Sequence, residues 1–370
     1  MGIDFAGSPR PTLGVEWELA LVDHTTRDLV NAAAELMGLV TARHGPEPRL
    51  HQEFLRNTVE LVTGICENTD EAIAELVELL AKVTPAAAEL GVDLFGAGTH
   101  PFAAWSEQLL TPGKRYEELM ARTQWWGQQM LIWGVHVHVG VRPEHVMPIV
   151  SALLNFYPHL QALSASSPVW DGHDTGYASN RAMMFQQLPT AGLPFQFETW
   201  AEFEAYAADL LTTGVIEEIN EIRWDVRPAP RTGTVEVRIC DGVSTLWELR
   251  ALVALTHCLV VDLADRLEAG ETLPTMPPWH VQENKWRAAR YGLEAWIILD
   301  AESNERLLRE DLVDLLERLE PVAVRLGCAQ DLALVHDITR LGASYQRQRA
   351  VAEETGGDLV AVVDAIVREL

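Results

Sequence analysis

The sequence has little cysteine and no hydrophobic run long enough to cross a membrane. The four cysteines are Cys66, Cys240, Cys258 and Cys328. They are far apart and form no C-x-x-C pair, which argues against a zinc ribbon and a disulfide framework. Residues 1–13 lack a basic segment followed by an apolar run, and no stretch reaches about 18 uncharged apolar residues. We therefore expect a cytoplasmic protein without a signal peptide or a membrane span.

Positive charge is also scarce. The chain has 28 lysine and arginine residues against 54 aspartate and glutamate residues, a formal net charge of -26. A broad basic surface for nucleic acid is therefore not expected, and a small anionic ligand would need local arginines or metal ions. The motif G-x-x-x-x-G-K-[ST] is absent, and "GAG" at 96–98 is too short for a G-x-G-x-x-G loop. Nucleotide binding of the P-loop or Rossmann type is thus excluded.

Four short segments alternate apolar and polar residues, which predicts half-buried β-strands. They are residues 13–22, 57–63, 133–141 and 233–240. Helical patterns lie between them and dominate residues 303–370, where we expect several amphipathic helices. Strands spread this widely among helices predict an α+β fold with one large, mainly antiparallel sheet and helices packed on one side.

Capping signals mark the start of three of the expected helices. Asn68 with Glu71 precedes the helical pattern of residues 69–90. The pairs Thr199–Glu202 and Thr245–Glu248 have capping-box spacing and precede two further apolar helical patterns, the second of which stops at Gly270.

The first strand has two glutamates on one face. In "GVEWEL" the apolar Val15, Trp17 and Leu19 share a face, which leaves Glu16 and Glu18 together on the other. Neighbouring glutamates on one face repel each other unless a cation lies between them.

Two other strands have the same design. "GVHVHVGV" places His136 and His138 opposite its valines, and "TVEVRI" places Glu236 and Arg238 opposite its apolar residues. Taken alone, each polar face is typical of the solvated side of an antiparallel sheet. Taken together, the three strands favour a metal site. The carboxylates suit Mg²⁺ or Mn²⁺ better than zinc, and such clusters usually hold nucleotide phosphates.

Two further glutamates lie in "HQEFLRNTVELVT". Glu60 has apolar neighbours in an expected strand, where a carboxylate usually has a partner. Glu53 could be an ordinary surface charge. Their spacing of seven residues does not bring them together in an extended segment.

Several arginines are candidates for binding substrate carboxylates or phosphate. Arg181 is flanked by apolar residues in "SNRAMMFQQ", so we expect it to face a defined partner. Arg287 and Arg290 lie three apart on one helical face, where they either bind substrate or pair with surface acids. Arg227 and Arg231 flank "PAP" in an expected loop and either reach phosphate or meet solvent.

The chain resembles a known family in several long stretches, from about residue 12 to the end. They are "GVEWEL", "EFLRNTVELVTGIC", "GTHPF", "GVHVHVGV", "SNRAMMFQQLPTAGLP", "GTVEVRICDG" and "ENKWRAARYGLEA". These stretches are similar to the YbdK-type carboxylate–amine ligases, a branch of the glutamate–cysteine ligase superfamily with a glutamine-synthetase-like catalytic fold. The resemblance implies a single catalytic domain over residues 1–370, with a helical C-terminal part at about 300–370. Its curved, mainly antiparallel sheet would form a funnel with helices on the outer face.

The resemblance also implies roles for the residues on the polar faces. The Mg²⁺ (or Mn²⁺) ligands would be Glu16, Glu18, Glu53, Glu60, His136 and Glu236. His138 would lie beside the ligands or at the substrate, in a substrate site that also includes Arg181, Arg287 and Arg290. Arg238 would steady the transferred phosphoryl group, with Glu236 as its catalytic neighbour.

The implied reaction consumes ATP in two steps. ATP phosphorylates the γ-carboxylate of glutamate, and an amino acid or another amine attacks the acyl phosphate to form a γ-glutamyl amide. The identity of the amine does not follow from the sequence. The helical tail offers apolar faces that could pack inward or against a second subunit of a homo-oligomer.

Two other functions compete with this one. A metal-dependent hydrolase is the first, because H-x-H pairs also bind zinc, and its further ligands would be His100 or His173 with Asp171 and Asp174. The second is a non-catalytic member that binds an amino acid or a nucleotide. Metal preference separates the first alternative from a ligase, and ATP consumption separates the second.

Overall fold

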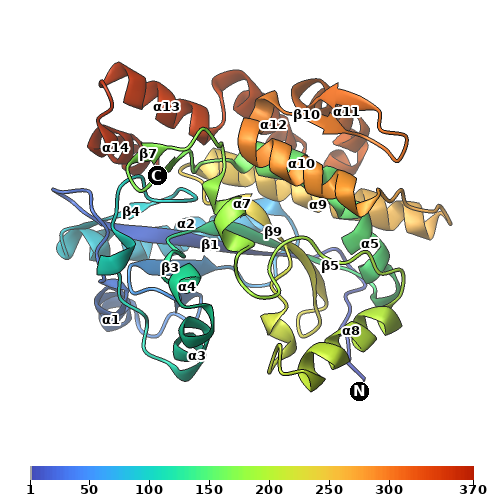
Figure 1. Ribbon diagram of the computed structural model, residues 1–370, viewed down its shortest axis with the longest axis horizontal. Helices are drawn as coiled ribbons and strands as arrows, with labels where there is room; N and C mark the ends of the chain where they lie inside the picture. The colour runs from blue at the N-terminus through green and yellow to red at the C-terminus, as the bar shows by residue number, and fades with distance from the viewer. Residues whose placement is uncertain (1) are drawn as a thin grey trace.

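A seven-stranded antiparallel sheet lies at the centre of the computed structural model, which describes residues 2–370 (Figure 1). Its spatial order is β2 (Leu50–Gln52), β3 (Thr58–Val62), β1 (Leu13–Asp23), β5 (Gly134–Gly140), β9 (Thr234–Asp241) and β8 (Val226–Ala229). A seventh strand, β4 (Val92–Phe95), pairs with the end of β1. The order leaves two edges, at β2 and β8, so the sheet is open. The predicted α+β fold with an antiparallel sheet is confirmed.

Strand β1 sets the register of the site. It pairs antiparallel with β3 on one side, where Glu18 lies opposite Glu60. On the other side its first half pairs with β5, where Glu16 lies opposite His136. Strand β5 in turn places His138 opposite Glu236 of β9. Residues of β3, β1, β5 and β9, which are distant in the sequence, thus meet on one face of the sheet.

The helices surround the sheet. They are α1 (Ala33–His44), α2 (Thr69–Glu89), α3 (Lys114–Thr123), α4 (Trp125–Gln128), α5 (Val146–Leu153), α6 (Tyr157–Ser164), α7 (Asn180–Phe185), α8 (Trp200–Thr212), α9 (Leu246–Glu268), α10 (Pro278–Tyr291), α11 (Leu308–Leu326), α12 (Ala329–Leu341), α13 (Ser344–Glu354) and α14 (Leu359–Glu369). Two hairpins, β6 (Val169–Trp170) with β7 (His173–Asp174) and β10 (Trp296–Ile298) with β11 (Glu305–Leu307), lie outside the main sheet. Side-chain caps of Asn68, Thr199 and Thr245 begin α2, α8 and α9, as the sequence predicts.

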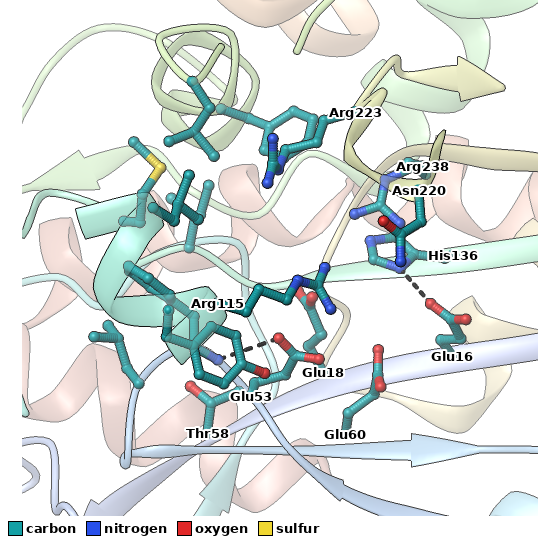
Figure 2. Close-up of a pocket in the computed structure, with 18 of the residues that line it drawn as sticks. Glu16, Glu18, Glu53, Thr58, Glu60, Arg115, His136, Asn220, Arg223 and Arg238 are labelled. Carbon is teal, nitrogen blue, oxygen red and sulfur yellow. Dashed lines mark hydrogen bonds and ion pairs between the residues drawn. The ribbon is translucent and has the colours of Figure 1, made fainter. Parts of the chain in front are cut away.

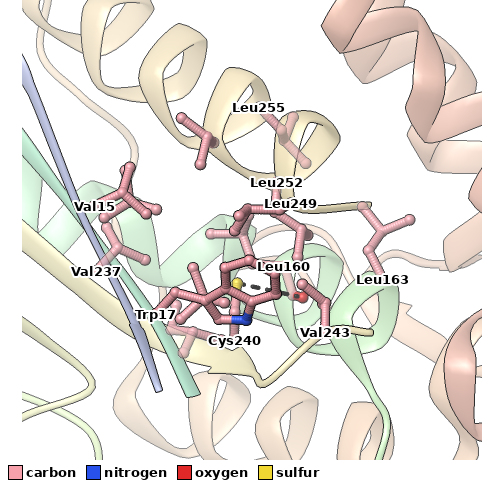
Figure 3. Close-up of a cluster of buried hydrophobic side chains, with 14 of the residues drawn as sticks. Val15, Trp17, Leu160, Leu163, Val237, Cys240, Val243, Leu249, Leu252 and Leu255 are labelled. Carbon is pink, nitrogen blue, oxygen red and sulfur yellow. Dashed lines mark hydrogen bonds between the residues drawn. The ribbon is translucent and has the colours of Figure 1, made fainter. Parts of the chain in front are cut away.

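The apolar face of the sheet packs on α6 and α9. Figure 3 shows Trp17 of β1 and Val237 of β9 in one buried cluster with Leu160 of α6 and Leu252 of α9. Burial of each such side chain stabilises the fold by about 1.5–3 kcal/mol. Because this packing fixes the alternate residues of β1, it directs Glu16 toward the opposite face.

The other face is partly covered at the far end of β1. Ala20 and Val22 lie on the same face of β1 as Glu16. They pack in a second cluster with Phe95 and with Ile366 of α14. The C-terminal segment forms the four consecutive helices α11 to α14. Within residues 2–370, no helix has both the length and the apolar composition that crossing a membrane requires.

Candidate active site

A cavity of about 370 Å³ opens on the polar face of the sheet (Figure 2). Its charged lining consists of four carboxylates, one imidazole and four guanidinium groups: Glu16, Glu18, Glu53, Glu60, His136, Arg115, Arg223, Arg227 and Arg238. Residues from the polar faces of β1, β3, β5 and β9 therefore line one cavity.

Glu16 lies between the two histidines of β5. Its Oε2 is 2.8 Å from His136 Nδ1, and its Oε1 is 3.1 Å from His138 Nε2. Burial alone would raise the pKa of Glu16, but the hydrogen bonds from the two histidines outweigh burial and hold it far below its usual range. Glu16 therefore stays ionised and can serve as a ligand at any physiological pH.

The two histidines differ in their partners. His136 is buried, and its Nε2 has no hydrogen-bond partner within residues 2–370. Burial and the positive charge of Arg238 lower the pKa of His136. His138 is bonded on both nitrogens, to Glu16 and, through Nδ1 at 2.9 Å, to Thr234 Oγ1. Burial opposes charging of His138, but Glu236 and Glu16 outweigh it and raise its pKa. His136 thus offers a free nitrogen to a ligand, whereas His138 does not.

Three further carboxylates line the cavity. Glu18 Oε2 accepts a hydrogen bond of 2.6 Å from the Gly134 N–H. Burial, followed by the charge of Glu18, raises the pKa of Glu53 to about 7. Burial and the charges of Glu53 and Glu16 raise the pKa of Glu60 well above its ordinary value. Buried carboxyl groups that repel one another in this way need protons or cations.

Glu236 is the anchor of two arginines. It accepts hydrogen bonds from Arg227 Nε at 2.7 Å and Arg227 Nη2 at 3.2 Å, and it also pairs with Arg238 Nη1. Burial would raise the pKa of Glu236, but Arg227 and Arg238 outweigh it and depress that pKa strongly. Arg238 Nη1 also lies 3.3 Å from His136 Nδ1, so its guanidinium joins the two sides of the site.

Two sets of side chains have the geometry of a cation site. Glu16, Glu60 and His136 form one set and Glu16, His138 and Glu236 the other, with the ligand atoms of each set within 4.8 Å of one another. Glu16 belongs to both sets. Glu18 and Glu53 line the same cavity but belong to neither set. The unpartnered His136 Nε2 and the repelling carboxyls fit a divalent cation with oxygen-rich ligands.

Three arginines predicted to bind substrate do not line this cavity. Arg181 is buried, and its Nη1 donates to the carbonyls of Arg238 and Ile239 at 3.3 and 3.4 Å. Arg287 lies on the outer surface of α10, where it pairs with Glu283 at 2.8 Å and with Glu305. Acidic partners nearby hold Arg287 there.

Of the remaining candidate arginines, two lie outside the cavity and one lines it. Arg290 of α10 donates to the Gly176 carbonyl, outside the cavity. Arg231 is exposed in the turn between β8 and β9, whereas Arg227 reaches Glu236.

The residues of the competing hydrolase site lie outside the polar-face cavity: His100 and Asp171 line a separate small cavity, and His173 Nδ1 contacts the Asp171 carbonyl at 2.7 Å. His100 is buried, and its Nε2 contacts the Arg27 carbonyl at 2.8 Å. His173 is exposed in the β6–β7 hairpin, and Asp174 pairs with Arg349 at 2.7 Å. None of these four residues belongs to either ligand set.

Two cavity arginines are absent from the sequence-based predictions. Arg115 comes from the first turn of α3, and Arg223 from the segment just before β8. No strand pattern connects Arg115 to the site. Arg223 lies four residues before Arg227, an even spacing that would place both side chains on one face of an extended segment. This spacing could have indicated that Arg223 reaches the site.

Comparisons with known proteins address the whole chain. The pattern of glutamate–cysteine ligase family 2 (GCS2) matches residues 12–365. The chain belongs to this family. A Nocardioides sp. protein provisionally named glutamate–cysteine ligase 2-3 is 68% identical over 371 residues, covering 100% of this chain and 99% of the relative. A Mycolicibacterium smegmatis protein provisionally named glutamate–cysteine ligase 2-1 is 68% identical over 369 residues, covering 100% of this chain and 97% of the relative.

Solved structures support the fold of this GCS2 member. A Francisella tularensis glutamate–cysteine ligase in complex with AMP superimposes with a TM-score of 0.68 at 15% identity, over 99% of this chain and 90% of that one. A bifunctional glutathione synthetase from Pasteurella multocida gives a TM-score of 0.65 at 15% identity, over 97% of this chain and 52% of that one. The family match and the similar relatives confirm the prediction that the chain is an ATP-dependent carboxylate–amine ligase.

Proposed function

We propose that this GCS2 member joins the γ-carboxylate of glutamate to the amino group of a second substrate in the cavity on the polar face. The observation that carries the proposal is the pair of ligand sets that share Glu16 directly beside Arg238. Such a site neutralises phosphate charge. The relatives named as glutamate–cysteine ligases support glutamate as the carboxylate donor and an amino acid as one acceptor.

The ligand sets would hold Mg²⁺ or Mn²⁺. Glu16, Glu60 and His136 are the first ligands we propose. The set of Glu16, His138 and Glu236 is the second candidate, and there His138 would have to exchange one of its hydrogen bonds for the cation. Bound there, the cation would offset the negative charge of the ATP phosphates. We propose that Glu18 and Glu53 complete the acidic lining and raise the affinity for the cation.

The chain's own residues position the reacting groups. Arg238, held by Glu236, presents its guanidinium toward the cavity, where it would contact the γ-phosphoryl group of ATP. Arg227 keeps Glu236 ionised and in place through its two hydrogen bonds. This supporting pair fixes the direction of Arg238 relative to His136.

The chemistry balances without a protein nucleophile. The γ-phosphoryl group moves from ATP to the glutamate γ-carboxylate, and ADP leaves. The amine nitrogen then attacks the acyl carbon, the C–N bond forms, the C–O bond to phosphate breaks, and inorganic phosphate and a proton are released. Such a reaction depends on positioning and charge neutralisation, which the cavity supplies. We propose a cytoplasmic site of action, while the single-domain and homo-oligomer assignments stay predictions.

Phosphate release tests the proposal. Purified protein is given Mg-ATP and L-glutamate, each amino acid is added in turn, and Glu236→Gln is compared with the exposed control Glu305→Gln. We expect release that needs glutamate and an amine and that persists only in wild type and the control. ATP-independent hydrolysis of a substrate, or binding of ATP and glutamate without any release, would contradict it.

A further inference from the structure

The cavity adjoins a second chamber of about 470 Å³, which we call the outer chamber because most of its lining residues are exposed. The two chambers share four lining residues, which we call the neck: Arg115, Leu119, Asn220 and Arg223. Helix α3 supplies two of them, and the segment before β8 supplies the other two. A ligand at the neck therefore lies between the outer chamber and the acidic floor of the first cavity, which consists of Glu16, Glu18, Glu53 and Glu60.

Arg223 is a nearly buried cation whose one counterion within residues 2–370 is distant. Its side chain is 12% exposed, and its one carboxylate neighbour within residues 2–370 is Glu221, with Nη2 and Oε2 3.9 Å apart. One N–H group, from Nη1, donates to the Glu221 carbonyl at 3.1 Å. In contrast, Arg227 and Arg238 are both paired directly with Glu236.

The surroundings of Arg223 increase its need for an anion. Burial lowers the pKa of Arg223 to about 10, and the neighbouring cations Arg115, Arg227 and Arg238 contribute to the decrease. Arg115 has no ion pair within the described part of the chain, and Figure 2 shows its guanidinium and that of Arg223 pointing into the cavity. Arg115, unpaired within residues 2–370, and Arg223, whose one counterion lies 3.9 Å away, form a site for an oxyanion at one constriction.

We propose that Arg223, with Arg115, binds the free carboxylate of an amino-acid substrate at the neck. The proposal rests on the proposed ligase function. We assign the phosphates of ATP to the metal-ligand sets and Arg238. The two arginines of the neck must therefore bind a different anion.

The outer chamber favours a zwitterion over a polyphosphate. It adds the carboxylates of Glu118, Glu217, Glu218 and Glu221 to its cations. These acids repel a triphosphate, whereas the ammonium group of an amino acid complements them. An amino acid with a free carboxylate therefore matches both the neck and the chamber that leads to it.

Steady-state kinetics test the proposal and identify the source of the carboxylate. Phosphate release is measured for wild type, Arg223→Met and Arg115→Met with Mg-ATP, L-glutamate and either L-cysteine or cysteamine, which lacks the carboxylate. Arg340→Met is the control, because Arg340 lies on α12 and pairs with Asp337 outside both chambers. Arg223→Lys keeps the charge, and the melting temperature of each variant reports folding.

For Arg223→Met we expect a KM increase of about tenfold or more for one amino-acid substrate, with the KM of ATP changed by less than about twofold. Arg223→Lys should recover part of the loss. If the carboxylate belongs to the acceptor, wild type prefers cysteine to cysteamine and the variant loses the preference. If it belongs to the donor, the KM of glutamate rises and the preference is unchanged.

Other results would overturn the proposal. A rise in the KM of ATP alone would assign the neck to phosphate, and a variant that matches Arg340→Met in every KM would leave the neck without a ligand role. Absence of turnover in wild type would instead contradict the ligase function. In that case calorimetric titration with L-glutamate and L-cysteine decides, because the proposal requires binding of one of them that Arg223→Met weakens by about tenfold or more.

Discussion

Glu18 of β1 and Glu60 of β3 lie directly opposite each other in the central sheet. Both line the cavity, and Glu60 is buried. Like charges at facing positions of an antiparallel pair are destabilising unless a proton or a cation neutralises them. The pair therefore makes the stability of the sheet depend on what the cavity binds.

Glu60→Gln should separate the stability of the metal-free protein from metal binding. In EDTA we expect the variant to be as stable as wild type or more stable by up to about 1 kcal/mol, because one facing charge is removed. With Mn²⁺ added, the melting temperature of wild type should rise and that of the variant should rise less. An equal Mn²⁺-induced rise in both proteins would show that Glu60 is not a ligand.

Stability without metal should fall as pH rises from about 4.5 to 7. The folded-state pKa of Glu53 is raised from 4.5 to about 7 by burial and by Glu18, so between these values the folded state holds a proton that the unfolded state has lost. Each unit of difference corresponds to about 1.4 kcal/mol. Urea unfolding in EDTA at several pH values measures this slope.

Glu53→Gln is the matched control for that slope, because it carries no titrating group at this position. The wild-type free energy of unfolding should decrease relative to the variant up to about pH 7 and stay level above it. Mn²⁺ affinity of wild type should increase over the same range, since the cation competes with the proton. Parallel stability curves for the two proteins would contradict the prediction.

The two histidines of β5 should differ when each is replaced by glutamine. His136 Nε2 is buried and has no partner among the described residues 2–370, whereas both nitrogens of His138 are engaged by Thr234 and Glu16. We expect His136→Gln to weaken Mn²⁺ binding about 10- to 100-fold and His138→Gln to weaken it less. Direct Mn²⁺ titration followed by electron paramagnetic resonance measures both. The reverse order would assign the metal to the set of Glu16, His138 and Glu236.

Arg238→Lys should lower kcat much more than it raises any KM. Lysine keeps the charge but cannot pair with Glu236 and reach the phosphoryl group with the same planar fork. We expect a decrease in kcat of about 10²- to 10³-fold with Mg-ATP and glutamate. Arg287→Lys is the control, because Arg287 is paired on the outer surface of α10. A loss confined to the KM of ATP would give Arg238 a binding role only.

Residues on the strands could be assigned to one face from the sequence, and residues elsewhere could not. Alternation placed Glu16, Glu18, His136, His138 and Glu236 on polar faces, because the pleat of a strand has a fixed period of two. For Arg181, Arg287 and Arg290 no such period relates the residue to the sheet. Their directions depend on which carbonyl or carboxylate lies nearest once the helices pack.

The sequence by itself determined the fold class, the polar faces of the strands and the family, since these follow from local periodicity and from long matching stretches. Tertiary structure alone decided the register that sets Glu18 against Glu60 and Glu16 against His136. It also brought Arg115 of α3 and Arg223 to one neck. Register and helix placement arise from packing between segments distant in the chain, and no local pattern encodes such distances.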